Sequence, residues 1–272
     1  MSNTKKIKKN KESFITKNIG WLVPLACIIA GELIYYFILG NPAGFQDPIN
    51  KKGPLNGLAR MYEGGFVVPI LMGLFLMVVV FSVERYLTIK IALGKSNNND
   101  FVHDIQEYLE NKDVDGAINH CNKQKGSVAN VMISGLNTYK AMINNMELDK
   151  EQKLANIQKE LEEATALELP MLQKNLVFLS TITSLSVLVA LFGTVLGMIR
   201  SFAALGDAGG GAGASELAVG ISEALYNTAV GIAAGAFALV MYNVFTTYID
   251  EISQKIDESG FSLLQNFSSL HK

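Results

Sequence analysis

Four long stretches with almost no charged side chains constrain the fold of this chain more than any other feature of its sequence. Residues 64–83 and 175–199 contain no charge, and residues 19–39 and 217–249 contain one glutamate each. A bilayer core about 30 Å thick requires roughly 20 apolar residues in a helix. The sequence therefore predicts an all-α, polytopic membrane protein with four transmembrane helices, whose long helices extend into a cytoplasmic helical region.

The composition agrees with this class and argues against others. Hydrophobic residues make up 49% of the 272 residues and charged residues only 18%, which is typical of a membrane protein. The net charge of −2 argues against a nucleic-acid partner, whose phosphates need a basic surface. The histidines and cysteines lack the spacing of a metal site or a disulfide framework, so we expect no metal and no cofactor. They are His103, His120, His271, Cys27 and Cys121.

The distribution of lysine and arginine predicts the orientation of the chain in the cell inner membrane. The first eighteen residues hold six lysines and one glutamate, so the positive-inside rule places the N-terminus in the cytoplasm, and four spans return the C-terminus to the same side. Lys51, Lys52 and Arg60 in the first outer loop run against this rule. Arg200, at the outer end of the third span, is expected to reach the lipid headgroups or to pair with Asp207.

These spans divide the chain into consecutive segments that alternate between the membrane and its two sides. They are a basic cytoplasmic N-terminus (1–18), a transmembrane helix (19–40), a periplasmic loop (41–63), a second transmembrane helix (64–90), a cytoplasmic helical region (91–172), a third transmembrane helix (173–203), a Gly-rich periplasmic loop (204–216), a fourth transmembrane helix (217–249) and a cytoplasmic tail (250–272).

The first span has two other interpretations. A basic start before an apolar stretch resembles a signal peptide, but about 20 residues exceed the usual 7 to 15 of the apolar region, and no small-residue cleavage site follows cleanly. Leu25-Ala26-Cys27 loosely resembles a lipoprotein cleavage box, but Pro24 stands where an aliphatic residue is expected. A transmembrane helix with a buried structural cysteine is the preferred interpretation.

The large hydrophilic region has a helical pattern, because its apolar residues recur every three to five positions. Ser127 is placed to cap one of its helices after a break at residues 122–126. A helix from residue 149 onward is expected to continue into the third span as one rod that bends at Pro170. The Gly-rich stretch 206–213 lacks the ending of a phosphate loop, so we interpret it as a flexible connector.

One face of the fourth span is small or polar, and we call it the fourth-span stripe. On a helical wheel at about 100° per residue, the members of this stripe share an arc of about 140°. They are Gly220, Glu223, Ala224, Asn227, Thr228, Gly231, Ala234, Gly235 and Ala238. The third-span stripe repeats the design within an arc of about 100°. Its members are Thr183, Ser186, Ala190, Gly193, Thr194, Gly197 and Ser201.

Close helix packing is the simplest explanation of both stripes, since small residues let backbones approach and hydroxyls bond across helices. Gly193 with Gly197, and Gly231 with Gly235, are small-residue pairs that fit this explanation, and Gly220 belongs to the same surface. These five glycines are the predicted packing residues.

Packing does not explain a carboxylate inside a membrane helix, which is costly to insert. Glu223 shares its face with Asn227 and Thr228, and such groups give an ion or a proton a place to pause beside water or a partner. Glu32, in the first span, has only the hydroxyls of the two following tyrosines at helical spacing. A contact to another helix or a protonated resting state would explain it.

Three motifs connect the last two spans to a known family. They are Leu-Phe-Gly-Thr-Val-Leu-Gly-Met-Ile-Arg-Ser-Phe at 191–202, Leu-Ala-Val-Gly-Ile-Ser-Glu-Ala-Leu-Tyr-Asn-Thr-Ala-Val-Gly-Ile-Ala-Ala-Gly at 217–235 and Tyr-Asn-Val-Phe at 242–245. Through them, residues 170–250 resemble the MotA/TolQ/ExbB proton channel family, and its ExbB and TolQ branch most closely.

The resemblance implies a homopentamer around a dimer of a single-span partner of the ExbD/TolR type, whose membrane aspartate takes up and releases protons. It also implies that Glu223 and Thr228 face the pore, and it places Thr194 in the family's Gly-Thr-Val motif. Together with Asn227, these residues form the predicted ion path.

Two departures from the family pattern stand out. Family members usually carry a pore-lining threonine and a proline where this chain has Leu185 and Val187. Thr183, Ser184 or Ser186 would have to supply the missing hydroxyl, so Thr183 and Ser186 complete the predicted ion path. The first span is an addition to the ordinary three-span subunit.

The expected function is that of an inner-membrane motor subunit, which converts proton motive force into work for TonB-dependent import or envelope maintenance through a TonB-like or TolA-like transducer. The alternative is a non-conducting scaffold that holds the single-span partner among the membrane lipids. No nucleophile, base and orienting group converge at motif spacing, so no enzymatic activity is expected. The sequence leaves open the branch, the choice between proton and sodium, the stoichiometry and the role of the first span.

Overall fold

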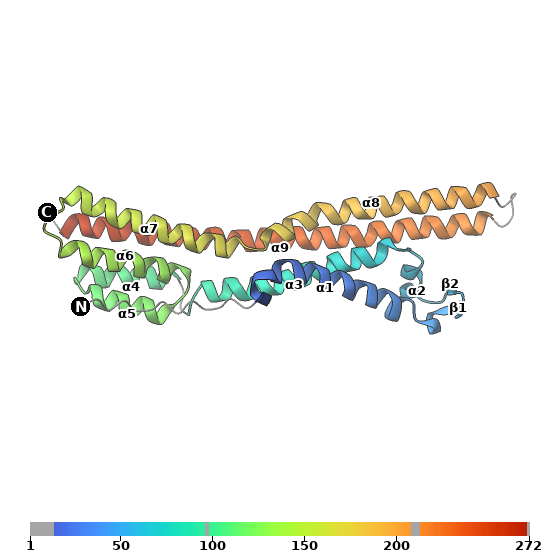
Figure 1. Ribbon diagram of the computed structural model, residues 1–272, viewed down its shortest axis with the longest axis horizontal. Coiled ribbons are helices and arrows are strands. Elements are labelled where there is room, and N and C mark those ends of the chain that lie inside the picture. Colours follow the sequence, from blue (N-terminus) through green and yellow to red (C-terminus); the bar gives the residue numbers. More distant parts are fainter. Residues whose placement is uncertain (1–13, 96–97, 208–212, 271–272) are drawn as a thin grey trace. The chain divides into compact units, whose positions relative to one another are not determined.

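The structure is a computed structural model that describes residues 14–95, 98–207 and 213–270, and helices dominate it (Figure 1). Five lysines of the N-terminus, His271 and the centre of the Gly-rich loop lie outside these ranges. Four helices are long and apolar enough to cross a membrane. The prediction of an all-α, polytopic membrane protein is therefore confirmed.

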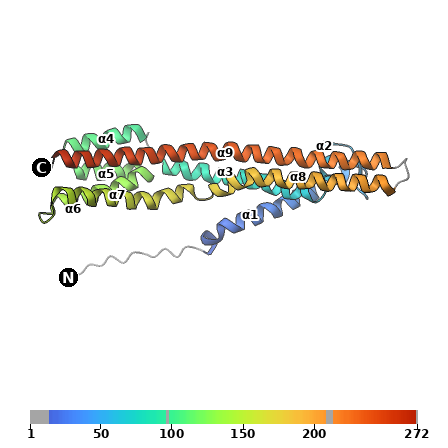
Figure 2. The same ribbon diagram turned by 90° about the horizontal axis from the view of Figure 1, so that it is seen from above.

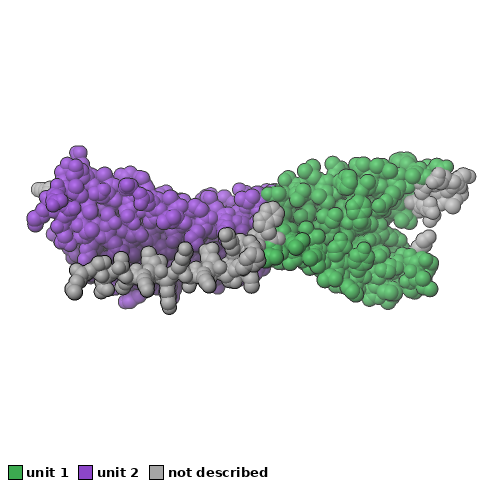
Figure 3. Space-filling model, in the orientation of Figure 1, with its two compact units in different colours: residues 1–80, 181–238 green, residues 81–180, 239–272 purple. Residues whose placement is uncertain are grey.

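The chain forms two compact units, each assembled from segments that are distant in sequence (Figure 3). Unit 1 contains residues 1–80 and 181–238, and unit 2 contains residues 81–180 and 239–272. Three helices contribute to both units: α3 (Val67–Ala92), α8 (Leu176–Asp207) and α9 (Gly213–Leu270). The 58 residues of α9 are far more than the roughly 20 that a bilayer core requires.

Unit 1 also holds the segments from α1 to α2. They are α1 (Phe14–Ile34), a π-helical turn η1 (Tyr35–Leu39), a 3-10 turn η2 (Pro42–Gly44), the strands β1 (Phe45–Asp47) and β2 (Lys52–Pro54), and α2 (Gly57–Tyr62). Helices α1 and α3 approach closely, because a Cβ atom at Gly31 would lie 2.6 Å from the Pro69 carbonyl oxygen. The antiparallel pair β1–β2 was not predicted from the sequence.

Tyr35, which directly follows α1, contacts α2 through Tyr62. Its ring stacks on Tyr62 at 4.5 Å between centroids, and its hydroxyl donates to the Tyr62 carbonyl at 2.9 Å. Leu39 and Val68 complete the buried cluster around it. The outer loop is thus anchored to the helices on both sides of it in the sequence.

Unit 2 consists of shorter helices packed with the inner ends of α3, α8 and α9. They are α4 (Asn98–Glu110), α5 (Val114–Gln124), α6 (Ser127–Ile143) and α7 (Lys150–Gln173). Asp149 begins α7 with a capping box that includes Gln152, the local signal that fixes such a start. Helix α7 lies along the C-terminal part of α9, and side chains of both helices line one pocket (Figure 2).

Two details of the sequence interpretation were wrong. Ser127 is the first residue of α6 and caps nothing, since the N-cap is Gly126, whose φ of 92° suits glycine. The break before α8 falls at Lys174 and Asn175 and not at Pro170, which stays within α7. Asn175 adopts a φ of 68°, and asparagine tolerates this left-handed conformation better than most residues.

Contacts of Arg85 explain why the helix is interrupted at Lys174 and Asn175. Its guanidinium is buried and donates to the Leu172 carbonyl at 3.1 Å, so it satisfies a carbonyl group that the end of α7 leaves free. Glu84 pairs with Arg85 and accepts from the Asn175 side chain at 3.3 Å. These tertiary contacts, and not the proline, define where one helix ends and the next begins.

Candidate ion path

The facing surfaces of α8 and α9 in unit 1 are the two stripes, and their small residues let the helices approach closely. A Cβ atom at Gly231 would collide with Ala190 and would lie 2.7 Å from the Ser186 carbonyl oxygen. A Cβ atom at Gly197 would lie 3.0 Å from the Gly220 carbonyl oxygen, which is also a tight contact. Figures 1 and 2 both show the two helices side by side.

The other two predicted packing glycines lie at similar contacts. A Cβ atom at Gly193 would lie 2.9 Å from the Asn227 side-chain nitrogen, and one at Gly235 would lie 2.9 Å from the Thr183 carbonyl oxygen. The close approach therefore continues along the stripes, with polar groups enclosed between the backbones.

Glu223 is buried near the N-terminal end of the fourth-span stripe, where it pairs with Arg200 of α8. The Arg200 Nη1 to Glu223 Oε1 distance is 2.9 Å, and the glutamate side chain is only 11% exposed. The structure thus gives Arg200 a partner in Glu223, whereas the side chain of Asp207, the partner expected from the sequence, lies outside the described part of the structure.

Asn227 lies one helical turn further along α9 and is fully buried. Its side-chain nitrogen donates to the Gly64 carbonyl at 3.1 Å, whereas its Oδ1 has no hydrogen-bond partner. Gly64 belongs to the turn before α3, so Asn227 connects the fourth-span stripe to the outer turn. Sequence reasoning did not include this turn in the site.

Thr194 and Thr228 form a hydroxyl pair across the two helices. Their Oγ1 atoms are 2.5 Å apart, and both side chains are partly buried. Each hydroxyl also lies within hydrogen-bonding distance of a backbone carbonyl of its own helix, Thr194 of Ala190 at 3.0 Å and Thr228 of Ala224 at 3.2 Å. Since each hydroxyl has one hydrogen, one threonine donates to the other, and the second donates to a carbonyl. The two threonines that the resemblance singled out are thus in direct contact.

Ser186 and Thr183 occupy the inner part of the third-span stripe. The Ser186 hydroxyl is fully buried, has no hydrogen-bond partner and faces Gly235. Leu185 and Val187, which replace the family's threonine and proline, are 39% and 44% exposed within the subunit. The structure therefore brings Ser186, and not Leu185, into the contact between the two helices.

Glu32 lies apart from these residues, on α1. The hydroxyl of Tyr35, one of its two expected partners, donates instead to the Tyr62 carbonyl. Glu32 is half-buried, and its role stays open.

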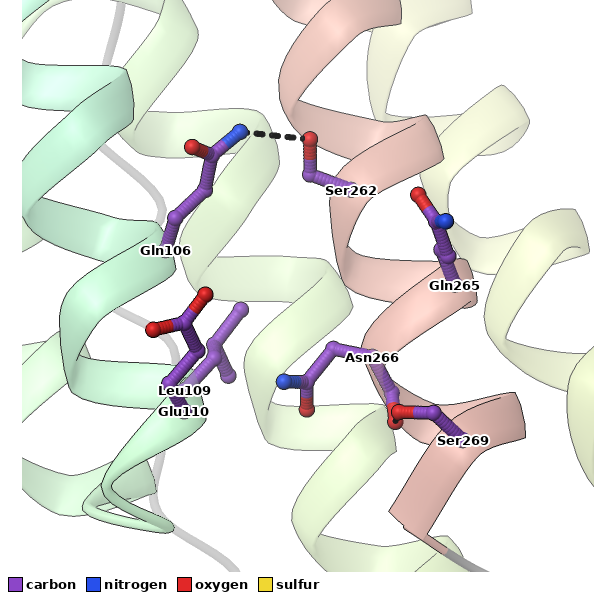
Figure 4. A pocket seen from close by; sticks show the side chains of 7 residues that line it. All are labelled: Gln106, Leu109, Glu110, Ser262, Gln265, Asn266 and Ser269. Atoms are coloured by element: carbon purple, nitrogen blue, oxygen red, sulfur yellow. Dashed lines mark hydrogen bonds between the residues drawn. The ribbon is translucent and has the colours of Figure 1, made fainter.

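Unit 2 contains a polar pocket between α4 and the end of α9 (Figure 4). Gln106 donates to the Ser262 hydroxyl at 2.9 Å across it, and Asn266 accepts from Tyr139 at 2.9 Å. Elsewhere in unit 2, burial raises the pKa of the Cys121 thiol in α5 to about 12, so this cysteine stays protonated at neutral pH. Amides and hydroxyls that already bond each other indicate a structural contact in the polar pocket.

The fold and the stripes define a multi-pass helical membrane protein in which small and polar side chains fill the contact between the last two spans. Residues 124–258 match the MotA/TolQ/ExbB proton channel family, and the chain belongs to this family. This confirms the resemblance stated from the motifs, and it supports the inner membrane as the location.

Relatives named ExbB and TolQ share this segment. The chain is 36% identical over 102 residues to an ExbB-like protein of Synechocystis, covering 37% of this chain and 49% of the relative. It is 38% identical over 87 residues to the Tol-Pal system protein TolQ of Haemophilus influenzae, covering 32% and 38%. It is 40% identical over 90 residues to the biopolymer transport protein ExbB of Salmonella typhimurium, covering 32% and 35%. The chain spans at most about half the length of these relatives.

Proposed function

We propose that the chain is an ion-conducting subunit of an inner-membrane motor of the ExbB/TolQ type, which converts proton motive force into mechanical work. The observation that carries this proposal is the line of polar groups from Glu223 through Asn227 to the Thr194–Thr228 pair, buried between two membrane helices. Helix packing requires only the glycines and alanines of the stripes. Polar and ionisable groups inside membrane helices are costly, and where they are retained they often mark the path of an ion.

The threonine pair supports a role in proton handling. A hydroxyl both donates and accepts, so two hydroxyls 2.5 Å apart form a unit that can reorient its hydrogen bonds when a charged group arrives beside it. Moving one charge through a potential of 100 mV releases about 2.3 kcal/mol, which is comparable with the energy of a few such hydrogen bonds.

The partner in this proposal is a single-span membrane protein with a carboxyl group that carries the proton. Five copies of the present chain would surround two copies of that partner, and a TonB-like or TolA-like protein would transmit the motion. The N-terminus and the C-terminus would lie in the cytoplasm, which the six N-terminal lysines favour. Family membership supports this assembly, and the partner's identity decides between nutrient import and envelope maintenance.

Proton flux in proteoliposomes that contain the chain and its single-span partner tests the proposal. We expect Glu223→Gln to lower the flux driven by a membrane potential, because the stripe loses its carboxylate. Glu251→Gln is the matched control, since Glu251 lies on the same helix but is exposed. If Glu223→Gln conducts like wild type, Glu223 has no role in the path.

A non-conducting scaffold is the second candidate, and the hydrogen bonds of the threonine pair favour it. One hydroxyl can donate to the other and the second to a backbone carbonyl, so both hydrogens have acceptors without any ion, as in ordinary helix packing. A complex that assembles with the partner but carries no proton current above that of empty vesicles would establish the scaffold.

A further inference from the structure

The Arg200–Glu223 pair is asymmetric in its exposure. The Arg200 side chain is 53% exposed within the subunit, whereas that of Glu223 is 11% exposed. The guanidinium can therefore reach water while it compensates a carboxylate that cannot. Removal of Arg200 would leave the buried charge of Glu223 without a partner. This is less favourable than leaving the exposed Arg200 unpaired.

A third element encloses this pair. Gly65, in the turn before α3, adopts a φ of 72°, and a Cβ atom there would lie 2.5 Å from Glu223 Oε1 and 3.1 Å from Arg200 Nη1. Asn227 holds the adjacent Gly64 through its carbonyl. The turn thus packs its bare backbone against the ion pair, and the carboxylate has a fixed place between three segments.

Few other ionisable groups act on Glu223 in the described part of unit 1. They are Glu63, which precedes the turn, and the Tyr35 hydroxyl of η1. Tyr35 donates to a backbone carbonyl, and Glu63 itself has Arg60 as its neighbouring cation. Arg200 is the cation in direct contact with Glu223.

We propose that Arg200 is a positioning residue that keeps Glu223 ionised, charge-compensated and turned toward the outer end of the stripes. This inference rests on the proposed function and assigns an ion preference to it. Because Arg200 neutralises the charge of Glu223, the path in each subunit has no net charge and is lined by neutral hydroxyl and amide groups. A metal cation finds no free carboxylate there, and the exposed guanidinium repels it.

A proton needs no such ligand, because the partner's carboxyl group carries it. The geometry therefore predicts conduction of protons and exclusion of sodium. Arg200→Gln would free the Glu223 carboxylate to accept either a proton or a sodium ion, and the path would lose its discrimination.

The test measures proton and sodium flux separately in proteoliposomes that hold the chain with its single-span partner. We expect Arg200→Gln to raise the ratio of sodium to proton flux by at least about tenfold. Arg200→Lys should keep the wild-type ratio, and Arg200→Gln with Glu223→Gln should restore it. A merely structural role would lower both fluxes together, with no recovery in the double variant. That result, or a wild-type complex that conducts sodium as well as protons, overturns the inference.

A second measurement does not depend on conduction. Infrared spectra of the assembled wild-type complex at pH 7 should lack the band of a protonated carboxyl group that Glu223→Gln removes, and Arg200→Gln should display this band. If wild type already shows it, Arg200 does not keep Glu223 ionised, even where the motor proposal holds. If the expected spectra appear in a complex that conducts no ion, the motor proposal fails and the positioning role of Arg200 stands.

Discussion

The stripes of unit 1 and the core of unit 2 both contain fully buried side chains, but these side chains differ in their chemistry. The largest fully buried side chains of unit 2 are aromatic or aliphatic. They include Phe101, Leu109, Met132, Leu136, Tyr139, Ile157, Ile252 and Phe267. Apart from Arg85, whose guanidinium is buried at the end of α7, the ion pairs of unit 2 lie nearer its surface, as in the Lys140–Asp115 pair, whose side chains are 48% and 69% exposed. In the stripes, the buried side chains are small or polar, and the polar ones are Ser186, Ser201, Glu223 and Asn227.

The difference teaches which buried groups the fold needs. Apolar burial contributes roughly 25 cal/mol per Å², so the core of unit 2 is explained by stability alone. In the stripes, the Ser186 hydroxyl and Asn227 Oδ1 are buried without a partner, whereas among the described residues of unit 2 only the Ser82 hydroxyl of α3 is buried in this way. An unsatisfied buried polar group costs about 1–3 kcal/mol. A surface that retains such groups is selected for something other than stability.

Among the substitutions considered, Leu136→Ala in the apolar core of unit 2 should lower stability the most. Leu136 is fully buried in α6, and truncation of a buried leucine costs about 2–5 kcal/mol because a cavity remains. Thermal denaturation of the purified complex measures this loss. Leu167→Ala is the matched control, since Leu167 is 74% exposed in the neighbouring α7. Proton flux per assembled complex should stay at the wild-type level below the transition, and a selective loss of flux would break the separation of the two regions.

Gly231→Ala should have the next largest effect, because the stripes have no room for a methyl group at this position. The new Cβ would collide with Ala190 and the Ser186 carbonyl, and overpacking of this kind costs about 1–3 kcal/mol. Gly57→Ala is the control, since a Cβ atom there meets nothing within 4 Å. Equal melting temperatures of the two variants would show that α8 and α9 do not pack as described.

Much of this architecture could be predicted from the sequence. Uncharged runs define the spans, and helical periodicity puts Glu223 and Thr228 on one face, since both depend only on local order along the chain. The partner of Arg200 and the turn at Gly64 and Gly65 could not be predicted, because they depend on which segments meet in three dimensions. The same holds for the break at Asn175, which tertiary contacts of Arg85 support.

Thr228→Val should separate the two explanations of the stripes at a smaller cost in stability. Valine keeps the shape but removes the hydroxyl that bonds Thr194, and hydrogen bonds between membrane helices contribute about 0.6–2 kcal/mol. We expect this modest loss together with a clear fall in proton flux. Thr247→Val is the control, because the Thr247 hydroxyl also bonds a carbonyl one turn back in α9 but lies outside the stripe. Reduced stability with unchanged flux would favour the scaffold.

The substitution Glu63→Gln should have the smallest effect, which appears only in how the melting temperature depends on pH. Burial raises the pKa of Glu63 above its usual value, and the charge of Arg60 offsets part of this shift. The folded protein therefore binds a proton that the unfolded chain has already released above its pKa of about 4.3. Stability due to this group is present at low pH and is lost as pH rises through the folded pKa. Glu63→Gln should remove this decline in melting temperatures measured between pH 4 and pH 7. Asp115→Asn, which alters an exposed carboxylate of unit 2, should leave the decline in place. If both variants change the pH dependence of the melting temperature equally, Glu63 is no more buried than a surface carboxylate of unit 2.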